Sequence, residues 1–289
     1  MSTSSNPTFS FEFFPPNTPE GREKLRVVTA ELAALKPKFF SVTYGAGGST
    51  RDRTLETVLE IQQSGHQAAP HISCIASTHA NIRDTLEGYR SHGIQHLVAL
   101  RGDLPSGLAT AGEFHYAFEL VDFIRREFGR HFFIEIAAYP EYHPQARDAL
   151  EDLRNFKRKV DAGATRAITQ FFFDTDDYLR FRDRCVAGGI GISIVPGILP
   201  ITRFPQVTRF AARCGARIPD WLAERFAGLD DDPDTRRLIA ANVAIEQVSR
   251  LRRHGVTEFH FYTLNRAELT YAICHALGLR PAAAREVAQ

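Results

Sequence analysis

Eight β-rich runs alternate with helix-patterned segments along almost the whole chain, and this alternation constrains the fold more than any other feature. The runs are FSFEFF, FFSVTYG, APHISCI, HLVALRGD, FFIEIAAYP, ATRAITQFFF, ISIVPGIL and EFHFYTLN. Strands that alternate with helices pair in parallel through crossover connections. Eight such units in 289 residues predict an α/β fold, a TIM (β/α)8 barrel, for which about 250 residues is typical.

The helix boundaries follow from capping residues and glycines. Thr18 is expected to cap a helix that has Pro19 at its first position and runs to about Leu35, and Thr50 to cap the helix RDRTLETVLEIQQ. Other helices are expected near 78–92, 113–129, 146–162, 175–187, 203–214, 234–254 and 266–278, with an extra helix, IPDWLAERFAGL, after the seventh strand.

An open doubly wound sheet is the alternative architecture, but the strand count and the absence of GxGxxG after the first run favour the barrel. We expect a single catalytic barrel domain over residues 1–289, with a short polar segment at 1–7 and a tail at 281–289.

Charge and composition exclude several function classes. The net charge of +1 supplies no basic field for nucleic acid, and no apolar run approaches the roughly 20 residues that span a bilayer. The polar start, MSTSSNPT, does not resemble a signal peptide. Four widely spaced cysteines without a CxxC pair favour reduced thiols in a cytoplasmic protein, and no metal site is expected.

Residues alternate between the two faces of a strand, and barrel chemistry lies at the carboxyl ends of the strands. In the first run the phenylalanines share one face, which should pack on helices, whereas Ser10 and Glu12 point into the barrel. The same parity directs Thr43 and His71 inward, together with Ser41 and Ser73. Barrel interiors are usually filled by branched aliphatic side chains, so these polar positions indicate a ligand site.

Other strand ends add candidates with two interpretations each. Arg101 and Asp103 flank Gly102 on one face, as an ion pair or as part of a site. Gln170 either hydrogen-bonds the backbone or reads a ligand's polar edge. Tyr139, His143, Tyr262 and Arg266 also follow strands.

Two short motifs also have two possible interpretations each. GAGGST, residues 45–50, could hold a phosphate but is more typical of a plain turn between a strand and a helix. The cations at Lys157, Arg158 and Lys159 form either a solvated helix face or a site for a phosphate-bearing cofactor. From the residues alone, the chain is predicted to be a barrel enzyme with a polar, acid-containing mouth.

The strand-end motifs resemble those of the methylenetetrahydrofolate reductase family, in its bacterial form that has only the catalytic domain. The matching segments are SFEFFPP, KPKFFSVTYGAGGSTRDRT, AAPHISCI, HLVALRGDLP, AAYPEYHPQA, NFKRKVDAGATRAITQFFFD, GILPITRF and FHFYTLNRAELTYAICHALG, in this order from about Ser10 to Gly278. The resemblance covers the catalytic barrel and not the adenosylmethionine-responsive regulatory domain of the eukaryotic members.

The resemblance implies an FAD-dependent oxidoreductase that works by a ping-pong hydride transfer. NADH or NADPH reduces the flavin and leaves, and 5,10-methylenetetrahydrofolate then accepts the hydride to give 5-methyltetrahydrofolate for methionine biosynthesis. The folate ring opens when N10 is protonated, which needs an acid that is still protonated near neutral pH. Burial among aromatic rings favours the neutral form of a carboxyl group.

By the same resemblance, Glu12 is the general acid, and Asp103 lies beside both the flavin and the pterin. Gln170, Gln206, Phe210, Tyr262 and Arg266 are implied to contact folate or nicotinamide. The FAD-binding residues that it implies are Thr43, Tyr44, Ala46, His71, Arg101, Gly102, Asp103, Tyr116, Tyr139, His143, Ala146, Asp152, Asn155, Arg158 and Lys159.

The resemblance also implies self-association into a homo-oligomer. The alternative function is a flavin-free methyltransferase or lyase that binds pterin or folate on the same barrel, which would use Asp103 and Gln170 without FAD. A flavin-free aldolase, with Glu12 as a simple base, and a barrel that binds folate or a partner without catalysis are further alternatives. The sequence does not discriminate between NADH and NADPH.

Overall fold

The computed structural model describes residues 7–45, 50–103 and 112–281. Its strands are β1 (Thr8–Phe13), β2 (Phe40–Val42), β3 (Ala68–Ser73), β4 (His96–Leu100), β5 (Phe133–Ala138), β6 (Arg166–Thr169), β7 (Ser193–Val195), β8 (Gly197–Ile198) and β9 (Glu258–Tyr262). Its helices are α1 (Pro19–Ala33), α2 (Arg51–Gln63), α3 (His79–Ser91), α4 (Ala117–Phe128), α5 (Ala149–Asp161), α6 (Thr175–Ala187), α7 (Phe204–Cys214), α8 (Asp220–Phe226), α9 (Pro233–Arg253) and α10 (Glu268–Ala276).

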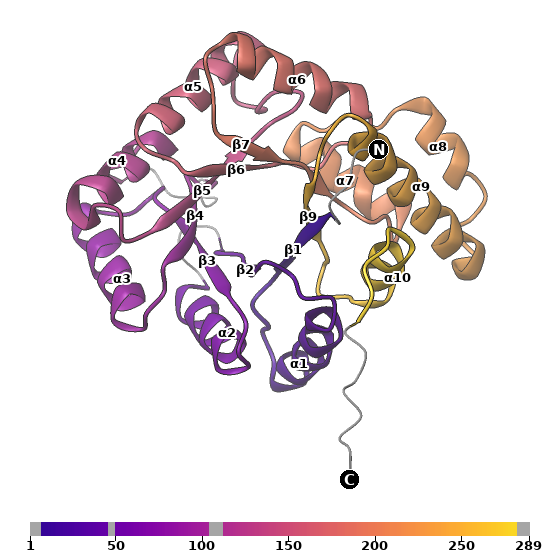
Figure 1. The fold of residues 1–289 in the computed structure, drawn as a ribbon, viewed down its shortest axis with the longest axis horizontal. Helices are drawn as coiled ribbons and strands as arrows, with labels where there is room; N and C mark the ends of the chain where they lie inside the picture. The colour runs from indigo at the N-terminus through magenta and orange to yellow at the C-terminus, as the bar shows by residue number, and fades with distance from the viewer. Residues whose placement is uncertain (1–6, 46–49, 104–111, 282–289) are drawn as a thin grey trace, which may run out of the picture.

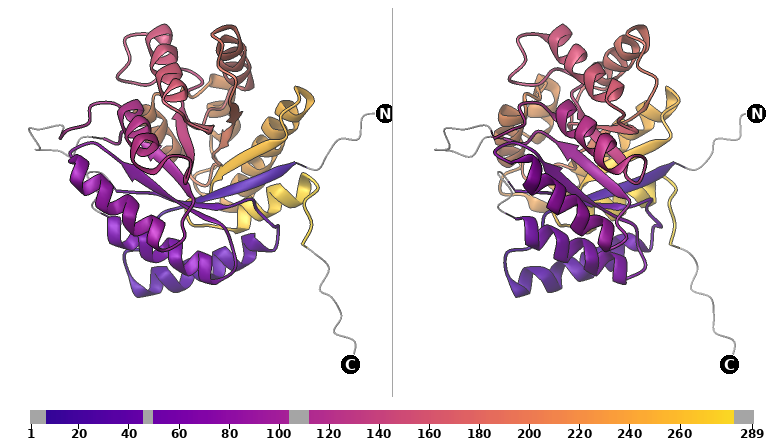
Figure 2. Two further views of the ribbon diagram at one scale, coloured as in Figure 1. Left: turned by 60° about the vertical axis from the view of Figure 1, so that its left-hand side comes forward. Right: turned by 90° about the vertical axis from the view of Figure 1, so that its left-hand side faces the viewer.

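The strands form a nearly closed parallel barrel that the helices surround (Figure 1). The sheet order is β7-β6-β5-β4-β3-β2-β1-β9-β8, and each pair of neighbours is parallel. Strands β1 and β9 lie side by side although they come from opposite ends of the chain (Figure 2). The predicted barrel and its alternation of strands and helices are therefore confirmed.

The seventh predicted strand differs from expectation because it forms in two pieces. Pro196 separates β7, which pairs with β6, from β8, which pairs with β9. Proline has no N–H to donate to the ladder. Its carbonyl instead accepts a hydrogen bond from the backbone N of His260 at 3.0 Å, and the N–H of Gly197 donates to Thr169 Oγ1 at 2.9 Å. The break therefore lies where the barrel closes.

Two helix starts illustrate how the predicted caps behave. Thr18 caps α1 as expected, because its hydroxyl accepts a hydrogen bond from the backbone N of Gly21 at 3.1 Å. Thr50 occupies the N-cap position of α2 but makes no side-chain cap. Its hydroxyl accepts instead from the backbone N of Gly45 at 2.7 Å, which connects the segment that follows β2 to the start of the helix. The extra helix after strand seven is confirmed as α8.

The predicted strand parity is also confirmed in β1. Phe9, Phe11 and Phe13 are buried in the main core, which includes Leu25 and Leu32 of α1. The opposite face of β1 points into the barrel, because the Ser10 hydroxyl contacts a ring nitrogen of a residue on β9. Local alternation alone therefore positions the inward polar residues. None of the helices in the described part of the chain is both long and apolar enough to cross a membrane.

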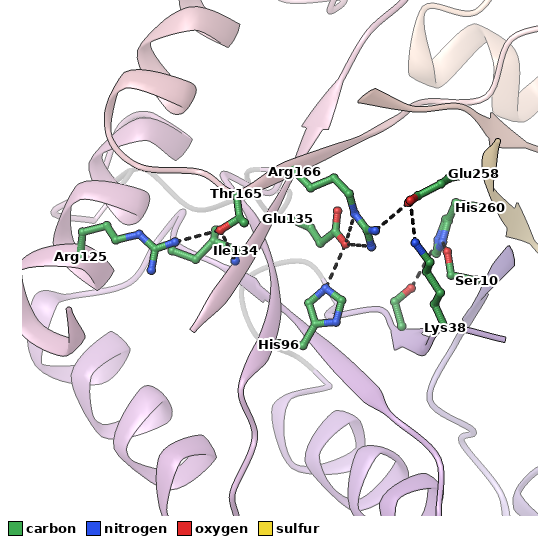
Figure 3. Close-up of polar contacts among 11 residues, drawn as sticks. Ser10, Lys38, His96, Arg125, Ile134, Glu135, Thr165, Arg166, Glu258 and His260 are labelled. Carbon is green, nitrogen blue, oxygen red and sulfur yellow. Dashed lines mark hydrogen bonds and ion pairs between the residues drawn. The ribbon is translucent and has the colours of Figure 1, made fainter. Parts of the chain in front are cut away.

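A charged group that the sequence analysis did not anticipate occupies the end of the barrel at which the strands begin. Glu135 of β5, fully buried, accepts hydrogen bonds from His96 Nε2 at 2.9 Å and from Arg166 Nε at 2.9 Å. Arg166 also pairs with Glu258 at 2.9 Å, and Glu258 with Lys38 at 2.6 Å (Figure 3). We call these five residues the basal charge layer.

Candidate active site

Two cavities open at the carboxyl ends of the strands, where barrel chemistry is expected. The outer cavity has a volume of about 330 Å³ and is lined by Ala99, Leu100, Arg101, Gly102, Asp103, Tyr116, Ala117, Phe118, Ala137, Tyr139, His143, Gln145, Ala146, Glu151, Asp152, Asn155, Arg158 and Lys159. The central cavity has a volume of about 410 Å³ and is lined by Glu12, Phe14, Thr43, Tyr44, His71, Val98, Leu100, Asp103, Ile136, Ala137, Tyr139, Ile168, Gln170, Phe171, Leu199, Phe210, Cys214, Tyr262 and Leu264.

The structure brings most of the predicted site residues to these two cavities, which share Leu100, Asp103, Ala137 and Tyr139. Arg101, Gly102, Tyr116, His143, Ala146, Asp152, Asn155, Arg158 and Lys159 line the outer cavity alone. Glu12, Thr43, Tyr44, His71, Gln170, Phe210 and Tyr262 line the central cavity alone. Gln206 and Arg266 line neither, and Ala46 falls outside the described residues.

Glu12 lies in the wall of the central cavity between two imidazole rings. Its side chain is only 13% exposed, and Oε2 lies 3.4 Å from His71 Nε2 and 3.7 Å from His260 Nε2. Burial lowers the pKa of His71 to about 4, although the neighbouring Glu12 carboxyl acts in the opposite direction. His71 is therefore a neutral imidazole near neutral pH, so it places no positive charge beside Glu12.

The end of β4 requires a glycine between Arg101 and Asp103. Gly102 has φ +83°, and a Cβ there would lie 1.8 Å from Ser73 Oγ. Among the described residues, Arg101 bonds Gln145 and the carbonyl of Gly102 rather than forming the ion pair with Asp103 that the sequence left open. Asp103 is exposed between the two cavities, where its carboxylate is available to a ligand.

Helix α5 supplies the polar wall of the outer cavity. Lys159 Nζ donates to the carbonyl of Ala137 at 2.5 Å, and burial lowers the pKa of Lys159 to about 8, against the effect of Asp152. Burial likewise raises the pKa of Asp152, which Lys159 opposes. Lys157 pairs with Asp161 at 2.8 Å on the exposed side of the helix. Both interpretations of the basic segment therefore apply in part, because Lys157 lies on the solvated face of the helix and Lys159 lines the outer cavity.

Tyr139 and His143 form an aromatic corner between β5 and α5. Their ring centroids are 4.7 Å apart in an edge-to-face arrangement. Burial, followed by the positive charges of Arg101 and Lys159, lowers the pKa of His143 to about 4. The outer cavity thus combines a neutral imidazole with permanent positive charge, which suits an anionic ligand that also carries a flat ring.

Three further residues form the opposite side of the central cavity. Tyr262 donates its hydroxyl hydrogen bond to the carbonyl of Thr169 at 2.6 Å, which fixes the ring. Gln170 accepts from the backbone N of Phe171 through Oε1 at 3.0 Å, so the amide does contact the backbone while it lines the cavity. Phe210 of α7 is half-buried and adds an aromatic surface.

His260 was not predicted from the sequence as a site residue, although after His71 it lies closest to Glu12 among the ion pairs described. The signal was present, because alternation along β9 puts His260 on the same face as Tyr262. Local patterns could not predict the contact, because Ser10 and His260 are 250 residues apart in the sequence, although Ser10 Oγ and His260 Nδ1 are 2.7 Å apart in the structure.

The comparisons with known proteins identify the family of the chain. The family model described as methylenetetrahydrofolate reductase matches residues 1–278. The 5,10-methylenetetrahydrofolate reductase of Escherichia coli (strain K12) is 54% identical over 273 residues, covering 94% of this chain and 91% of the relative. The corresponding enzyme of Pectobacterium carotovorum subsp. carotovorum is 52% identical over 277 residues, covering 96% and 92% of the two chains.

A plant relative and a solved structure extend the comparison. Methylenetetrahydrofolate reductase (NADH) 1 of Arabidopsis thaliana is 38% identical and covers 94% of this chain, which spans 48% of the plant protein. A Clostridium thermocellum protein that binds two copies of 5-methyl-5,6,7,8-tetrahydrofolic acid has a TM-score of 0.63 at 14% identity, covering 96% of this chain and 95% of its own. At that identity the likeness concerns the barrel fold alone.

Proposed function

The chain belongs to the methylenetetrahydrofolate reductase family and is an oxidoreductase, and from this premise we propose how its two cavities divide the reaction. The outer cavity holds FAD. The central cavity takes reduced nicotinamide and 5,10-methylenetetrahydrofolate in turn, and 5-methyltetrahydrofolate is the product. The observation that carries this proposal is the meeting of the two cavities at Asp103 and Tyr139, with Glu12 on the central side.

The residues of the outer cavity fit FAD. Arg158 and Lys159 supply positive charge for a diphosphate, and Asp152 and Asn155 supply acceptors and donors for ribose hydroxyls. Gly102 lines the same cavity, and its missing Cβ lets the end of β4 lie close against Ser73 of β3. When bound there, FAD supplies the ability to accept a hydride from one substrate and to deliver it to the next.

Glu12 is proposed as the general acid that protonates N10 of the folate. Its carboxyl group is only 13% exposed and lines the central cavity, and the neutral His71 lies 3.4 Å away. Protonation makes N10 a leaving group, and the carbon that it leaves becomes the electrophile that accepts the hydride. Proton transfer by a positioned acid typically contributes about 10²- to 10⁴-fold to a rate.

Asp103, Gln170, Phe210 and Tyr262 are proposed to position the substrates. Asp103 can hydrogen-bond the pterin while its charge acts on the flavin, because it lines both cavities. Phe210 offers a surface for stacking, and Gln170 a polar edge. Gln206 and Arg266 would have to reach a part of the ligand that extends beyond the central cavity.

The size of the shared space supports a proposed ping-pong order. The central cavity, at about 410 Å³, lies at the lower end of the roughly 300–1,000 Å³ range of ligand pockets. One planar ligand at a time can contact the same wall, so the oxidised nicotinamide must leave before the folate enters.

The family resemblance further supports a homo-oligomer, which light scattering of the purified protein tests.

Anaerobic stopped-flow spectroscopy tests the proposed function directly. The purified protein, supplied with FAD if needed, is mixed with NADH or NADPH while the flavin absorbance is followed, and then with methylenetetrahydrofolate. We expect bleaching by a nicotinamide and recovery of colour with folate. A protein that turns over or binds folate without any dependence on FAD would instead support a flavin-free methyltransferase or lyase.

A further inference from the structure

The surroundings of Glu12 assign a role to a histidine that the proposed mechanism has not used. His260 is completely buried beneath Glu12, with its Nε2 3.7 Å from Glu12 Oε2 and 3.5 Å from Ser41 Oγ. Its other ring nitrogen, Nδ1, lies 2.7 Å from Ser10 Oγ (Figure 3). The imidazole therefore bridges Ser10 at one end and the carboxyl group of Glu12 at the other.

The contact with Ser10 determines which nitrogen carries the proton. Ser10 is buried, and its one described side-chain hydrogen bond is to His260 Nδ1. Two buried hydroxyl groups contact the ring, Ser10 at 2.7 Å from Nδ1 and Ser41 at 3.5 Å from Nε2. The shorter contact is the stronger hydrogen bond, so we take Ser10 as the donor to Nδ1, and Ser41 then accepts at the Nε2 side. A neutral imidazole has one donor and one acceptor nitrogen. The proton of the ring is then on Nε2, which faces Glu12.

Two aromatic rings pack against the imidazole of His260. Phe39 stacks on one side at 5.9 Å, and Tyr262 packs edge-on at 5.5 Å. Phe39 also contacts His96 at 4.3 Å, so this ring separates His260 from the basal charge layer. The titratable groups that face His260 are Glu12 and Tyr262, with His71 on the far side of Glu12.

We propose, on the basis of the proposed function, that His260 is a positioning residue for the general acid. Ser10 holds its imidazole in the tautomer whose Nε2–H points at Glu12, and that N–H donates to the carboxylate as Glu12 releases its proton to N10. The present separation of 3.7 Å is longer than a hydrogen bond, and such contacts tighten when substrate binds. In this role His260 relays no proton.

Variants of the two residues separate this role from a structural one. Ser10→Ala removes the group that fixes the tautomer, and His260→Leu removes the donor. His260→Gln keeps an N–H donor directed toward Glu12. We expect Ser10→Ala and His260→Leu to slow folate reduction by the loaded enzyme about tenfold, with His260→Gln closer to wild type, because a hydrogen bond to a charged group is worth at least this factor.

The half-reactions and the pH profile give the decisive readouts. Without the donor the carboxylate is less stable, so the pH limit of the folate half-reaction should move upward, while flavin reduction by nicotinamide stays within twofold of wild type. Ser41→Ala is the matched control, because it deletes a buried hydroxyl near the same ring but leaves Nδ1 untouched. Equal loss of both half-reactions, or no change in Ser10→Ala, overturns the proposal.

A measurement without cofactor tests the tautomer itself. Proton–nitrogen correlation spectra of the histidine rings, assigned with His260→Gln, should show the proton on Nε2 in wild type and a mixture of tautomers in Ser10→Ala. A proton on Nδ1 in wild type overturns the inference, whether or not the chain is a flavoenzyme. Conversely, a wild-type protein with the Nε2 tautomer but no flavin-dependent turnover contradicts the proposed function and leaves His260 without a reaction to support.

Discussion

At the scale of single residues, the proposed proton transfer to folate depends on the carboxyl group of Glu12. We expect Glu12→Gln to keep the reduction of flavin by nicotinamide and to slow the folate half-reaction by at least about 100-fold, because an amide cannot donate the proton. Stopped-flow absorbance measures both steps. Glu31→Gln, on the exposed face of α1, is the control. Parallel loss of both steps in Glu12→Gln would show that Glu12 is structural.

The charge of Lys159 should make the affinity of the outer cavity for FAD depend on pH. Its pKa is lowered to about 8, below the ordinary lysine value, chiefly by burial. The cation that attracts a diphosphate is therefore complete below pH 8 and is lost as the pH rises through 8. We expect the Kd for FAD to increase above about pH 8, and Lys159→Met to bind FAD more weakly without this inflection. Fluorescence titration measures the Kd across pH.

The neighbouring Lys157 supplies the control for this experiment, because it has the same side chain but pairs with Asp161 at the surface. Lys157→Met should reproduce the wild-type pH dependence. An inflection that persists in Lys159→Met would assign the titration to another group of the outer cavity.

At the scale of elements, the exit of β4 depends on Gly102. Gly102→Ala places a Cβ 1.8 Å from Ser73 Oγ, at φ +83°, so either the end of β4 shifts or the Ser73 hydroxyl moves and gives up its hydrogen bond to the carbonyl of Arg101. We expect a loss of about 1–3 kcal/mol in the free energy of unfolding and a marked loss of FAD affinity. Urea denaturation and FAD titration measure the two effects.

Gly65→Ala is the matched control for Gly102→Ala. Gly65 has the same φ of +83°, but a Cβ there meets nothing within 4 Å. This variant should show the cost of the backbone conformation alone, with FAD affinity unchanged. If the two variants behave alike, the close approach of β4 to β3 has no part in shaping the outer cavity.

At the scale of the whole molecule, the basal charge layer joins β4, β5, β6 and β9 across the barrel interior. Burial alone would raise the pKa of Glu135, but hydrogen bonds from His96 and Arg166 outweigh it and hold the pKa below its ordinary value. A lowered carboxyl pKa contributes stability above the unfolded value of about 4.3, and this stability is lost as the pH falls through the folded value.

Glu135→Gln should therefore destabilise the barrel by about 3–5 kcal/mol near pH 7, because Arg166, whose side chain is only 11% exposed, loses its fully buried charged partner and keeps only Glu258. The loss should shrink as the pH falls below 4. Urea denaturation at several pH values measures it. Asp161→Asn, which breaks the exposed pair with Lys157, should cost at most about 1 kcal/mol. A cost as small for Glu135→Gln would contradict a structural role for this layer.

The sequence by itself determined the order of strands and helices and the direction in which Glu12 points. Both depend on local periodicity, which the chain carries in each run of five to ten residues. The same reasoning identified Asp103 and His71, because a strand end in a parallel barrel leads to the mouth. In β1, where the assignment required only the alternation of neighbouring residues, the structure agrees with it, whereas Thr43 and Tyr44, which follow β2, both line the central cavity.

Only the tertiary structure decided which of these residues meet. Closure of the barrel brings Ser10 and His260 within 2.7 Å, and it places Arg166 against Glu135 and Glu258. It also breaks the seventh strand at Pro196. These contacts depend on the register between strands that are distant in sequence, and register is set by the packing of the whole ring rather than by any one segment.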